Sequence, residues 1–388
     1  MNPWHASKTD HSAVPKAGPL AHIDRRRTPL PPFKDIDMHT TLSRMAKSTL
    51  GRREALVGGS ALTASLLIPG LALAAPQSER NARKSEVTVR NVTFKNDAID
   101  MAGNLYLPKD FSESRKYPTV ISVHPGGGVK EQTAGLYARL LAEQGFVALA
   151  FDASHQGASG GMPRLLDDPM RRVADIYSAV DYLTSLPYVD AGRIGALGIC
   201  AGSGTTVKAA SIERRIKAVA TVSAVDVGAA TRKGWDGKAT EAEQLAMLEG
   251  VAKERTAAAS GAAPTYVNYV PQVGDKTAPM DLQEAADYYL TPRGQHPNAP
   301  NRMLMTSLSA MVSFTGFDRV DLLTQPLMIV AGSEAGSLWH SQELHAKAPG
   351  PKQLVIVEGA THMDLYDRDA TKVATNQLVP FFTTTLQG

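Results

Sequence analysis

The sequence predicts an α/β fold in which a mostly parallel sheet is covered by helices on both faces. Short apolar runs such as residues 119–123 and 146–151 are typical of buried parallel strands. Segments with helical spacing separate these runs, for example the apolar positions between 173 and 183. The composition, 43% hydrophobic and 20% charged, is ordinary for a soluble globular chain.

The expected elements follow one another in a regular order. Residues 87–94 alternate like an edge strand, and residues 98–107 form a second strand. The later strands are expected at 119–123, 146–151, 193–199, 216–222, 326–331 and 353–357. Helices are expected from about 136 to 145, at 173–183, directly after residue 200 and at 371–386.

Residues 226–320 interrupt this alternation. The segment is rich in Pro, Tyr and Met, and residues 241–256 and 282–289 have helical character. A connection of this length is uncommon unless it has a function of its own. We therefore expect one α/β domain over residues 76–388 with an inserted lid at 226–320, the alternative being a long decorated loop.

Residues 1–75 are expected to be a targeting segment and are left out of the fold. Arg52 and Arg53 precede an apolar, glycine-containing stretch at 57–73, and residues 72–74 read Ala-Leu-Ala, a cleavage signal. This arrangement resembles a twin-arginine export signal, so the export machinery is an expected partner and the location is periplasmic or secreted. An uncleaved anchor is the alternative.

The charge of the chain is concentrated in that first segment. Residues 1–75 hold ten Lys and Arg against five Asp and Glu, which leaves 31 basic and 33 acidic residues in the remainder. The globular part is nearly neutral, so no nucleic-acid partner is expected. Residues 1–37 are polar and proline-rich, which is unusual for the start of a signal segment. We therefore expect translation to start at Met38 or Met45 and the residues before it to result from a mis-assigned start.

The run 193–204 carries the most specific chemical signal. A short apolar strand ends in Gly198-Ile199-Cys200-Ala201-Gly202 and continues directly into a helix. This is the layout of a nucleophile elbow with cysteine in place of serine, and the helix N-terminus beneath the sulfur favours thiolate. Since Cys200 is the only cysteine, no intrachain disulfide can form. The alternative is a small buried cysteine packed under a strand.

Three motifs together resemble a known superfamily. They are the elbow at 198–202, the run His-Pro-Gly-Gly-Gly-Val-Lys-Glu-Gln-Thr at 124–133 and the run Gly-Ala-Thr-His-Met-Asp-Leu-Tyr at 359–366. Over residues 86–388 the chain resembles the α/β-hydrolases. The elbow is similar to that of dienelactone hydrolases, and the other two motifs to YcjY-like hydrolases and related fungal polyketide acyltransferases. The resemblance implies an α/β-hydrolase fold with a catalytic triad.

The triad residues follow from their places in the chain, because the order in this fold is nucleophile, acid, histidine. Cys200 is the expected nucleophile. His362 follows the last predicted strand within Gly-x-x-His, which is the expected place for the base. Glu334, just after the preceding strand, is the favoured acid and Asp318 the alternative. Glu343 is interpreted as a carboxylate on a helix surface.

The expected oxyanion hole joins the backbone N–H of Ala201 to an N–H of the glycine loop. Gly126, Gly127 and Gly128 are the candidates in that loop, and glycine allows the backbone to approach a substrate closely. The other reading, a phosphate-binding loop, is weak because no Gly-Lys-Ser/Thr follows.

Two serines also need to be weighed as nucleophiles. Ser159 lies in Gly-Ala-Ser-Gly-Gly, whose residue types match the elbow pattern. This run follows a polar loop, however, whereas an elbow follows a strand. Ser203 has glycines at the wrong spacing and is expected one turn inside the helix. Neither is expected to be the nucleophile.

These residues predict a hydrolase of carboxylic esters, lactones or thioesters that acts on a small acyl substrate through a covalent cysteine intermediate. An acyltransferase using the same triad is one alternative, and a noncatalytic exported thiol sensor or binding protein is another. No cofactor is expected, and no Cys/His cluster has metal-ligand spacing. Aromatic side chains of the insertion, including Tyr269, Tyr289 and Trp235, suggest an apolar pocket.

Overall fold

The computed structural model describes residues 86–387, and its main feature is an eight-stranded sheet. The strand order is β1-β2-β4-β3-β5-β6-β9-β10. β2 pairs antiparallel with β1 and β4, and every other neighbouring pair is parallel. The strands are β1 Thr88–Asn96, β2 Ile99–Leu107, β3 Tyr117–Val123, β4 Val147–Phe151, β5 Val189–Ile199, β6 Ile216–Val222, β9 Leu327–Gly332 and β10 Lys352–Val357. The mostly parallel sheet expected from the sequence is confirmed.

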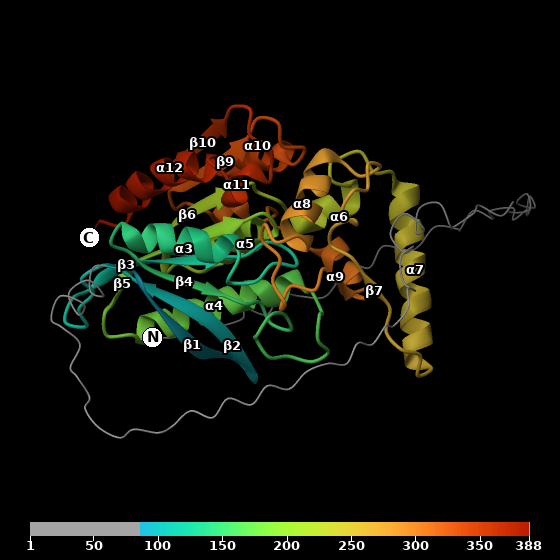
Figure 1. The fold of residues 1–388 in the computed structure, drawn as a ribbon, viewed down its shortest axis with the longest axis horizontal. Helices are drawn as coiled ribbons and strands as arrows, with labels where there is room; N and C mark the ends of the chain where they lie inside the picture. The colour runs from blue at the N-terminus through green and yellow to red at the C-terminus, as the bar shows by residue number, and fades with distance from the viewer. Residues whose placement is uncertain (1–85, 388) are drawn as a thin grey trace, which may run out of the picture. The chain divides into compact units, whose positions relative to one another are not determined.

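Helices cover both faces of the sheet (Figure 1). One face packs against α3 and α12, and the other against α4, α5 and α10. A short helix, α11, precedes α12, and a 3-10 turn, η1, lies close to α5 and α10. Their bounds are α3 Thr133–Glu143, α4 Pro169–Ser185, α5 Ala201–Ile212, α10 Leu338–Lys347, α11 Asp364–Asp367, α12 Ala370–Thr385 and η1 Val320–Leu322.

The two apolar cores follow from the alternation of side chains along each strand. In β3, Ile121 and Val123 enter the core on the α4 and α5 face, whereas Val120 enters the core beneath α3 and α12. All three side chains are buried, which explains why the central strands read as continuous apolar runs. The carboxyl ends of the parallel strands therefore emerge at one edge of a rigid, doubly covered sheet.

The insertion at 226–320 forms helices and a two-stranded ribbon. Its elements are α6 Val227–Lys233, α7 Glu241–Ala259, β7 Tyr266–Val267, α8 Met280–Leu290, β8 Met303–Leu304 and α9 Ser307–Ser313. The helices expected at 241–256 and 282–289 correspond to α7 and α8, whereas α6 and α9 were not expected. α7 buries only Val251, and α8 buries one face that includes Tyr288 and Tyr289.

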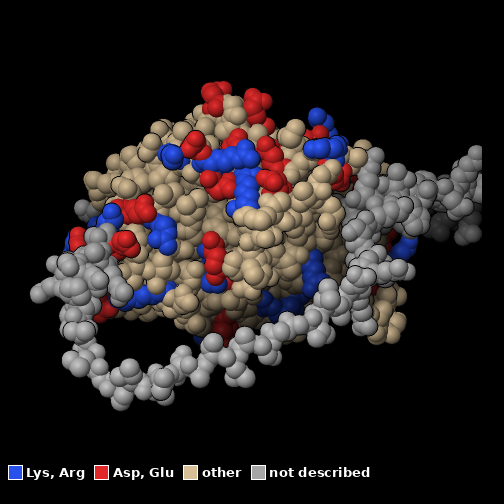
Figure 2. Space-filling model, viewed as in Figure 1, with Lys and Arg blue, Asp and Glu red and all other residues tan. Residues whose placement is uncertain are grey.

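The surface of the described region carries charges of both signs. On the face shown in Figure 2, Lys and Arg lie among Asp and Glu without a field of one sign. None of the helices within residues 86–387 combines the length and the apolar character that crossing a membrane requires. The expected targeting segment at 1–75 lies outside the described residues.

Candidate active site

Cys200 occupies a strained turn between β5 and α5. Its backbone has φ 53° and ψ −124°, a conformation that residues other than glycine rarely adopt. A Cβ on Gly198 would lie 2.5 Å from the carbonyl oxygen of Gly202, and one on Gly202 would lie 2.4 Å from that of Val123. Both glycines are therefore required sterically. This strand–turn–helix geometry is the one that the elbow pattern predicts.

The Cys200 side chain is half-buried, and several hydrogen-bonding groups act on its thiol. Burial raises its pKa above the usual value, while the hydroxyl of Tyr366, the amides of Ala201 and Gly126 and the charge of Arg172 act in the opposite direction. Burial outweighs these contributions, so the thiol is protonated at neutral pH. The expectation of a resting thiolate at the helix N-terminus is therefore not met, and ionising this thiol requires a base.

Two backbone amides act to lower the pKa of the Cys200 thiol. They belong to Ala201, at the start of α5, and Gly126, in the loop after β3. Gly127 has φ 69°, and a Cβ there would lie 2.6 Å from the Tyr269 ring, so this glycine makes room for an aromatic side chain. The Gly128 amide donates within the loop, to the carbonyl of Pro125 at 3.2 Å. Of the three loop glycines proposed, Gly126 is the one whose amide acts on the Cys200 thiol.

A buried ion pair supports the glycine loop from below. Arg172 donates to Asp167 at 2.8 Å and to the carbonyl oxygen of His124 at 3.3 Å. Tyr269 of the insertion donates to the same Asp167 carboxylate at 2.7 Å. Nδ1 of His124 lies 2.7 Å from the carbonyl of Pro125, and its Nε2 accepts from the amide of Ala153 at 3.0 Å. These contacts hold the Gly126 amide in a fixed direction.

His362 lies beside the elbow, in the loop between β10 and α11. The side chain is buried, and burial lowers its pKa to about 4, although the nearby Asp281 carboxylate acts to raise it. Its Nδ1 lies 2.6 Å from Oγ of Ser337, and its Nε2 lies 3.3 Å from the hydroxyl of Tyr366. A neutral imidazole with an accepting Nε2 is the form that a general base needs at neutral pH.

The carboxylates predicted as triad acids do not reach His362. Glu334 is exposed, and Ser337, three residues further along the same loop, occupies the place next to Nδ1. Asp318 is paired with Lys208, and Glu343 with Lys347 on the surface of α10. The assignment of Glu334 does not fit this geometry, because the loop turns its side chain outward.

The carboxylate that acts on this histidine is Asp281, which sequence reasoning missed. Asp281 is buried at the start of α8 and accepts from the indole of Trp235 at 2.8 Å and from the amide of Gly336 at 2.7 Å. The backbone N–H of His362 lies 3.5 Å from its other oxygen. Asp281 satisfies the chain order of nucleophile, acid, histidine, but an aspartate in the first turn of a helix is usually read as a cap.

Both serines considered above form hydrogen bonds with backbone atoms. Ser159 lies in the loop after β4, where its hydroxyl donates to the carbonyl of Asp152 at 2.6 Å and accepts from the amide of Ala102 at 2.9 Å. Ser203 lies in the first turn of α5 and donates to the carbonyl of Gly198 at 2.9 Å. Both hydroxyls thus connect backbone segments.

Tyrosines enclose the remaining side of Cys200. Tyr366 is buried, hydrogen-bonded to the thiol and packed edge-on against Tyr288 and Tyr289, with ring centroids 5.4 and 6.4 Å away. Tyr366 follows His362 by four residues, so a short helical turn brings both side chains to one face. That spacing, within the motif at 359–366, is the sequence signal that could have indicated Tyr366.

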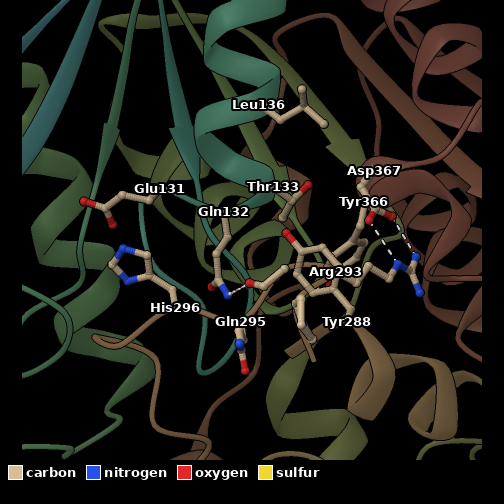
Figure 3. Close-up of a pocket in the computed structure, with 12 residues that line it drawn as sticks. Glu131, Gln132, Thr133, Leu136, Tyr288, Arg293, Gln295, His296, Tyr366 and Asp367 are labelled. Atoms are coloured by element: carbon tan, nitrogen blue, oxygen red, sulfur yellow. Dashed lines mark hydrogen bonds and ion pairs between the residues drawn. The ribbon is translucent and has the colours of Figure 1, made fainter. Parts of the chain in front are cut away.

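A surface pocket lies on the outer side of this tyrosine cluster (Figure 3). Its volume is about 340 Å³, and Tyr288 and Tyr366 form part of its wall. Arg293 of the insertion bridges Asp367 at 2.7 Å and Asp287 at 3.2 Å along the rim, and Gln132 donates to the carbonyl of Gly294 at 2.7 Å. The insertion is therefore tied to α3 and α11 beside the candidate site.

No group of three or more His, Cys, Asp and Glu side chains within residues 86–387 has a metal-binding arrangement. The polar groups around Cys200 instead form pairs that hold backbone amides and a neutral imidazole in place. The chemistry that this arrangement can perform is acyl transfer to and from sulfur.

Comparisons with known proteins agree with this fold. Residues 101–225 match the dienelactone hydrolase family. The uncharacterized protein YcjY of Escherichia coli strain K12 is 46% identical over 294 residues, which cover 75% of this chain and 96% of YcjY. The crystal structure of the hypothetical protein PA2218 from Pseudomonas aeruginosa has 36% identity and a TM-score of 0.72, with 78% of this chain and 94% of that chain covered.

More distant relatives carry names that state an activity. The thiohydrolase aneE of Aspergillus aculeatus is 26% identical over 287 residues, covering 72% of this chain and 88% of aneE. The polyketide transferase grgF of a Penicillium species is 26% identical over 276 residues, covering 69% and 88%. The crystal structure of the α/β hydrolase GrgF from a Penicillium species has 24% identity and a TM-score of 0.64, with 77% of this chain and 99% of that chain covered. The chain thus belongs to the dienelactone-hydrolase-like group of the α/β-hydrolases, and it is a hydrolase or an acyltransferase.

Proposed function

We propose that the protein hydrolyses carboxylic esters, lactones or thioesters of small acyl compounds through a covalent intermediate on Cys200. The observation that carries this proposal is the strained strand–helix turn that places Cys200 at the start of α5, where the Ala201 and Gly126 amides act on its thiol. A tetrahedral oxyanion formed next to that sulfur would accept hydrogen bonds from both amides.

In the first half of the reaction, the thiol loses its proton to Nε2 of His362 and the sulfur attacks the acyl carbon. A carbon–sulfur bond forms while the carbonyl electrons move to the oxygen, which the Ala201 and Gly126 amides stabilise. The oxyanion then collapses and the bond to the leaving group breaks. The imidazolium returns its proton to the departing alcohol or thiol, which leaves an acylated Cys200.

In the second half, His362 takes a proton from water and the resulting hydroxide equivalent attacks the thioester carbon. Collapse of the second oxyanion breaks the carbon–sulfur bond and releases the acid. The imidazolium then returns its proton to the sulfur, which regenerates the thiol and the neutral His362. Asp281, buried behind His362, provides the negative charge that favours the transient imidazolium. Ser337 at Nδ1 keeps Nε2 free to accept the proton.

An acyltransferase is the second candidate, because an alcohol in place of water would react with the same intermediate. Two observations favour it. His362 is buried beneath insertion side chains, including Trp235 at a ring-centroid distance of 4.9 Å, and one relative is named a polyketide transferase. A site shielded in this way gives an acceptor alcohol an advantage over water. The noncatalytic thiol sensor is the remaining alternative, and it does not need His362.

The test uses the full chain with para-nitrophenyl esters and acyl thioesters of increasing chain length. We expect a burst of released product followed by turnover, and no burst in Cys200→Ala. Added alcohols that produce ester in place of acid would support the transferase. A folded wild type without a burst on any of these substrates would contradict both enzymatic candidates and favour the sensor.

Two further expectations from the sequence stay proposals. Residues 1–75 are proposed to direct export by the twin-arginine route, which fusion of this segment to a reporter enzyme tests, with Arg52→Lys and Arg53→Lys together as the negative control. Residues 226–320 are proposed to act as a lid. Cross-linking α8 to the glycine loop should block turnover if the insertion must move.

A further inference from the structure

The hydroxyl of Tyr366 contacts both of the groups that must exchange a proton. It lies 3.3 Å from Nε2 of His362 and is hydrogen-bonded to the Cys200 thiol. In the part of the chain that the structure describes, no hydrogen bond joins the sulfur directly to the imidazole. The connection between nucleophile and base therefore passes through a phenol.

Both ends of this connection are neutral at rest. Burial raises the pKa of the Cys200 thiol, and burial lowers the pKa of His362 to about 4. The site thus starts as thiol and imidazole rather than as a thiolate–imidazolium pair. The proton of the thiol must therefore move to His362 during the attack itself. It needs a path between the sulfur and the imidazole, and Tyr366 lies between them.

We propose that Tyr366 is a catalytic residue that relays the proton between Cys200 and His362. This inference rests on the proposed function and adds a step to it. As the sulfur attacks, the thiol proton passes to the phenol oxygen while the phenol's own proton passes to Nε2. The sulfur–hydrogen bond and the phenol O–H bond break, and a new phenol O–H bond and an N–H bond form. Tyr366 ends the step as it began, a neutral phenol.

The surroundings of Tyr366 suit this role. Burial and the neighbouring sulfur raise its pKa well above the usual value, so the hydroxyl keeps a proton to donate. Nδ1 of His362 faces Ser337, which leaves Nε2 as the acceptor for that proton. The edge-on contacts with Tyr288 and Tyr289 fix the ring, so its hydroxyl stays directed at the two partners.

The first test is the substitution Tyr366→Phe in the full chain, which keeps the ring and removes the hydroxyl. We expect the burst rate with para-nitrophenyl butyrate at pH 7 to fall about 100-fold, the usual contribution of positioned proton transfer. As the pH rises and the thiol ionises, no relay is needed, so the variant should recover toward the wild-type rate. Alkylation by iodoacetamide, measured over the same pH range, reports where the thiol ionises.

Tyr137→Phe is the matched control. Tyr137 is another buried tyrosine, and its hydroxyl donates to the carbonyl of Leu365 at 2.8 Å, next to Tyr366 in the chain. This variant loses a buried hydrogen bond of the same kind and should melt at a lower temperature. Its burst rate and its pH profile should match those of the wild type.

A second measurement needs no variant and therefore does not depend on folding. Two protons move together in the relay, so the burst rate of the wild type in mixtures of light and heavy water should curve downward with the deuterium fraction. A straight line would mean that one proton moves and would overturn the relay. So would a Tyr366→Phe burst that equals the wild type at pH 7 or is reduced equally at every pH.

Cys200→Ala separates failure of the relay from failure of the proposed function. If Cys200→Ala retains the burst, the covalent cysteine mechanism is wrong whatever Tyr366 does. If Cys200→Ala abolishes the burst while Tyr366→Phe leaves it intact, only the relay is wrong. Near-ultraviolet circular dichroism of Tyr366→Phe and Tyr137→Phe checks that both variants retain their packed aromatic cluster.

Discussion

Oγ of Ser337 lies 2.6 Å from Nδ1 of His362, where the sequence predicted a carboxylate. The serine comes from the loop after β9, which is the place where the acid was sought, and Glu334 of the same loop is exposed. The negative charge comes instead from Asp281 in the insertion, which contacts Gly336 beside Ser337 and the backbone of His362. Orientation and charge stabilisation of this histidine are thus divided between two segments.

Ser337→Ala should impair the reaction more than loss of the predicted acid. A hydrogen bond to Nδ1 is worth about 1–1.5 kcal/mol, so we expect kcat/KM to fall about tenfold. Glu334→Gln should remain within about twofold of the wild type, because its side chain points into solvent. Steady-state kinetics on one para-nitrophenyl ester compares the two. The opposite order of effects would restore Glu334 as the acid.

Asp281→Asn should lower both kcat and stability. The carboxylate raises the pKa of His362 against the effect of burial, so its loss makes the imidazolium less favourable. The substitution also weakens the hydrogen bonds from Trp235 and Gly336, at a cost of about 1–3 kcal/mol in the free energy of unfolding. Asp287→Asn, at a half-exposed position of the same helix, is the control and should change neither kcat nor stability appreciably.

Gly198→Ala and Gly202→Ala should each destabilise the fold severely. The added Cβ would meet backbone atoms at 2.5 and 2.4 Å, and backbone cannot move aside as a side-chain tip can. We expect a loss of about 3 kcal/mol or more in urea unfolding. Gly192→Ala, where the new Cβ meets only the Asp190 carboxylate at 3.3 Å, should stay close to the wild type. Equal stability of all three variants would mean that the elbow is less tight than described.

Stability should fall as the pH drops from about 6.5 toward 4. Burial lowers the pKa of His124 and His362 to about 4 and that of His340 to about 3. Above pH 6.5 these side chains are neutral in both states, whereas below it the unfolded chain binds protons that the folded chain excludes. Each histidine then costs about 2 kcal/mol at pH 5. Burial raises the pKa values of Asp175 and Asp226, so these side chains take up protons more readily in the folded state. Their protonation opposes the loss of stability as the pH falls.

His340→Gln isolates one part of this dependence. Its imidazole is buried beside Trp339, and Nδ1 accepts from the amide of Asp226 at 3.4 Å. The difference in unfolding free energy between wild type and variant should be constant above pH 6.5 and should shift by about 2 kcal/mol against the wild type by pH 5. A difference that does not change with pH would show that His340 is protonated in the folded protein.

Local sequence signals were sufficient to predict the sheet and the elbow. Central strands bury both faces and therefore read as apolar runs, and the glycines at 198 and 202 reflect steric demands within a single turn. His362 and the glycine loop also follow from their positions after particular strands. All of these features depend on residues that lie close together in the sequence or on strand order.

The remaining parts of the site depend on how distant segments pack. Asp281 reaches His362 only because α8 of the insertion folds back toward the loops after β9 and β10, and nothing in its neighbours indicates this. The outward turn of Glu334 depends on the conformation of one loop. Tyr366 is part of the motif at 359–366, but its hydroxyl acquires a role only when α11 lies against Cys200.

The identity of the residue that carries the acyl group is the central claim, and mass spectrometry tests it directly. The full chain is mixed with para-nitrophenyl butyrate, quenched in acid during the burst and digested. The account predicts a butyryl mass increment on the peptide that contains Cys200, lost on treatment with hydroxylamine and absent from Cys200→Ala. A butyryl group on a serine such as Ser159 or Ser203, or turnover with no acylated peptide, would contradict it.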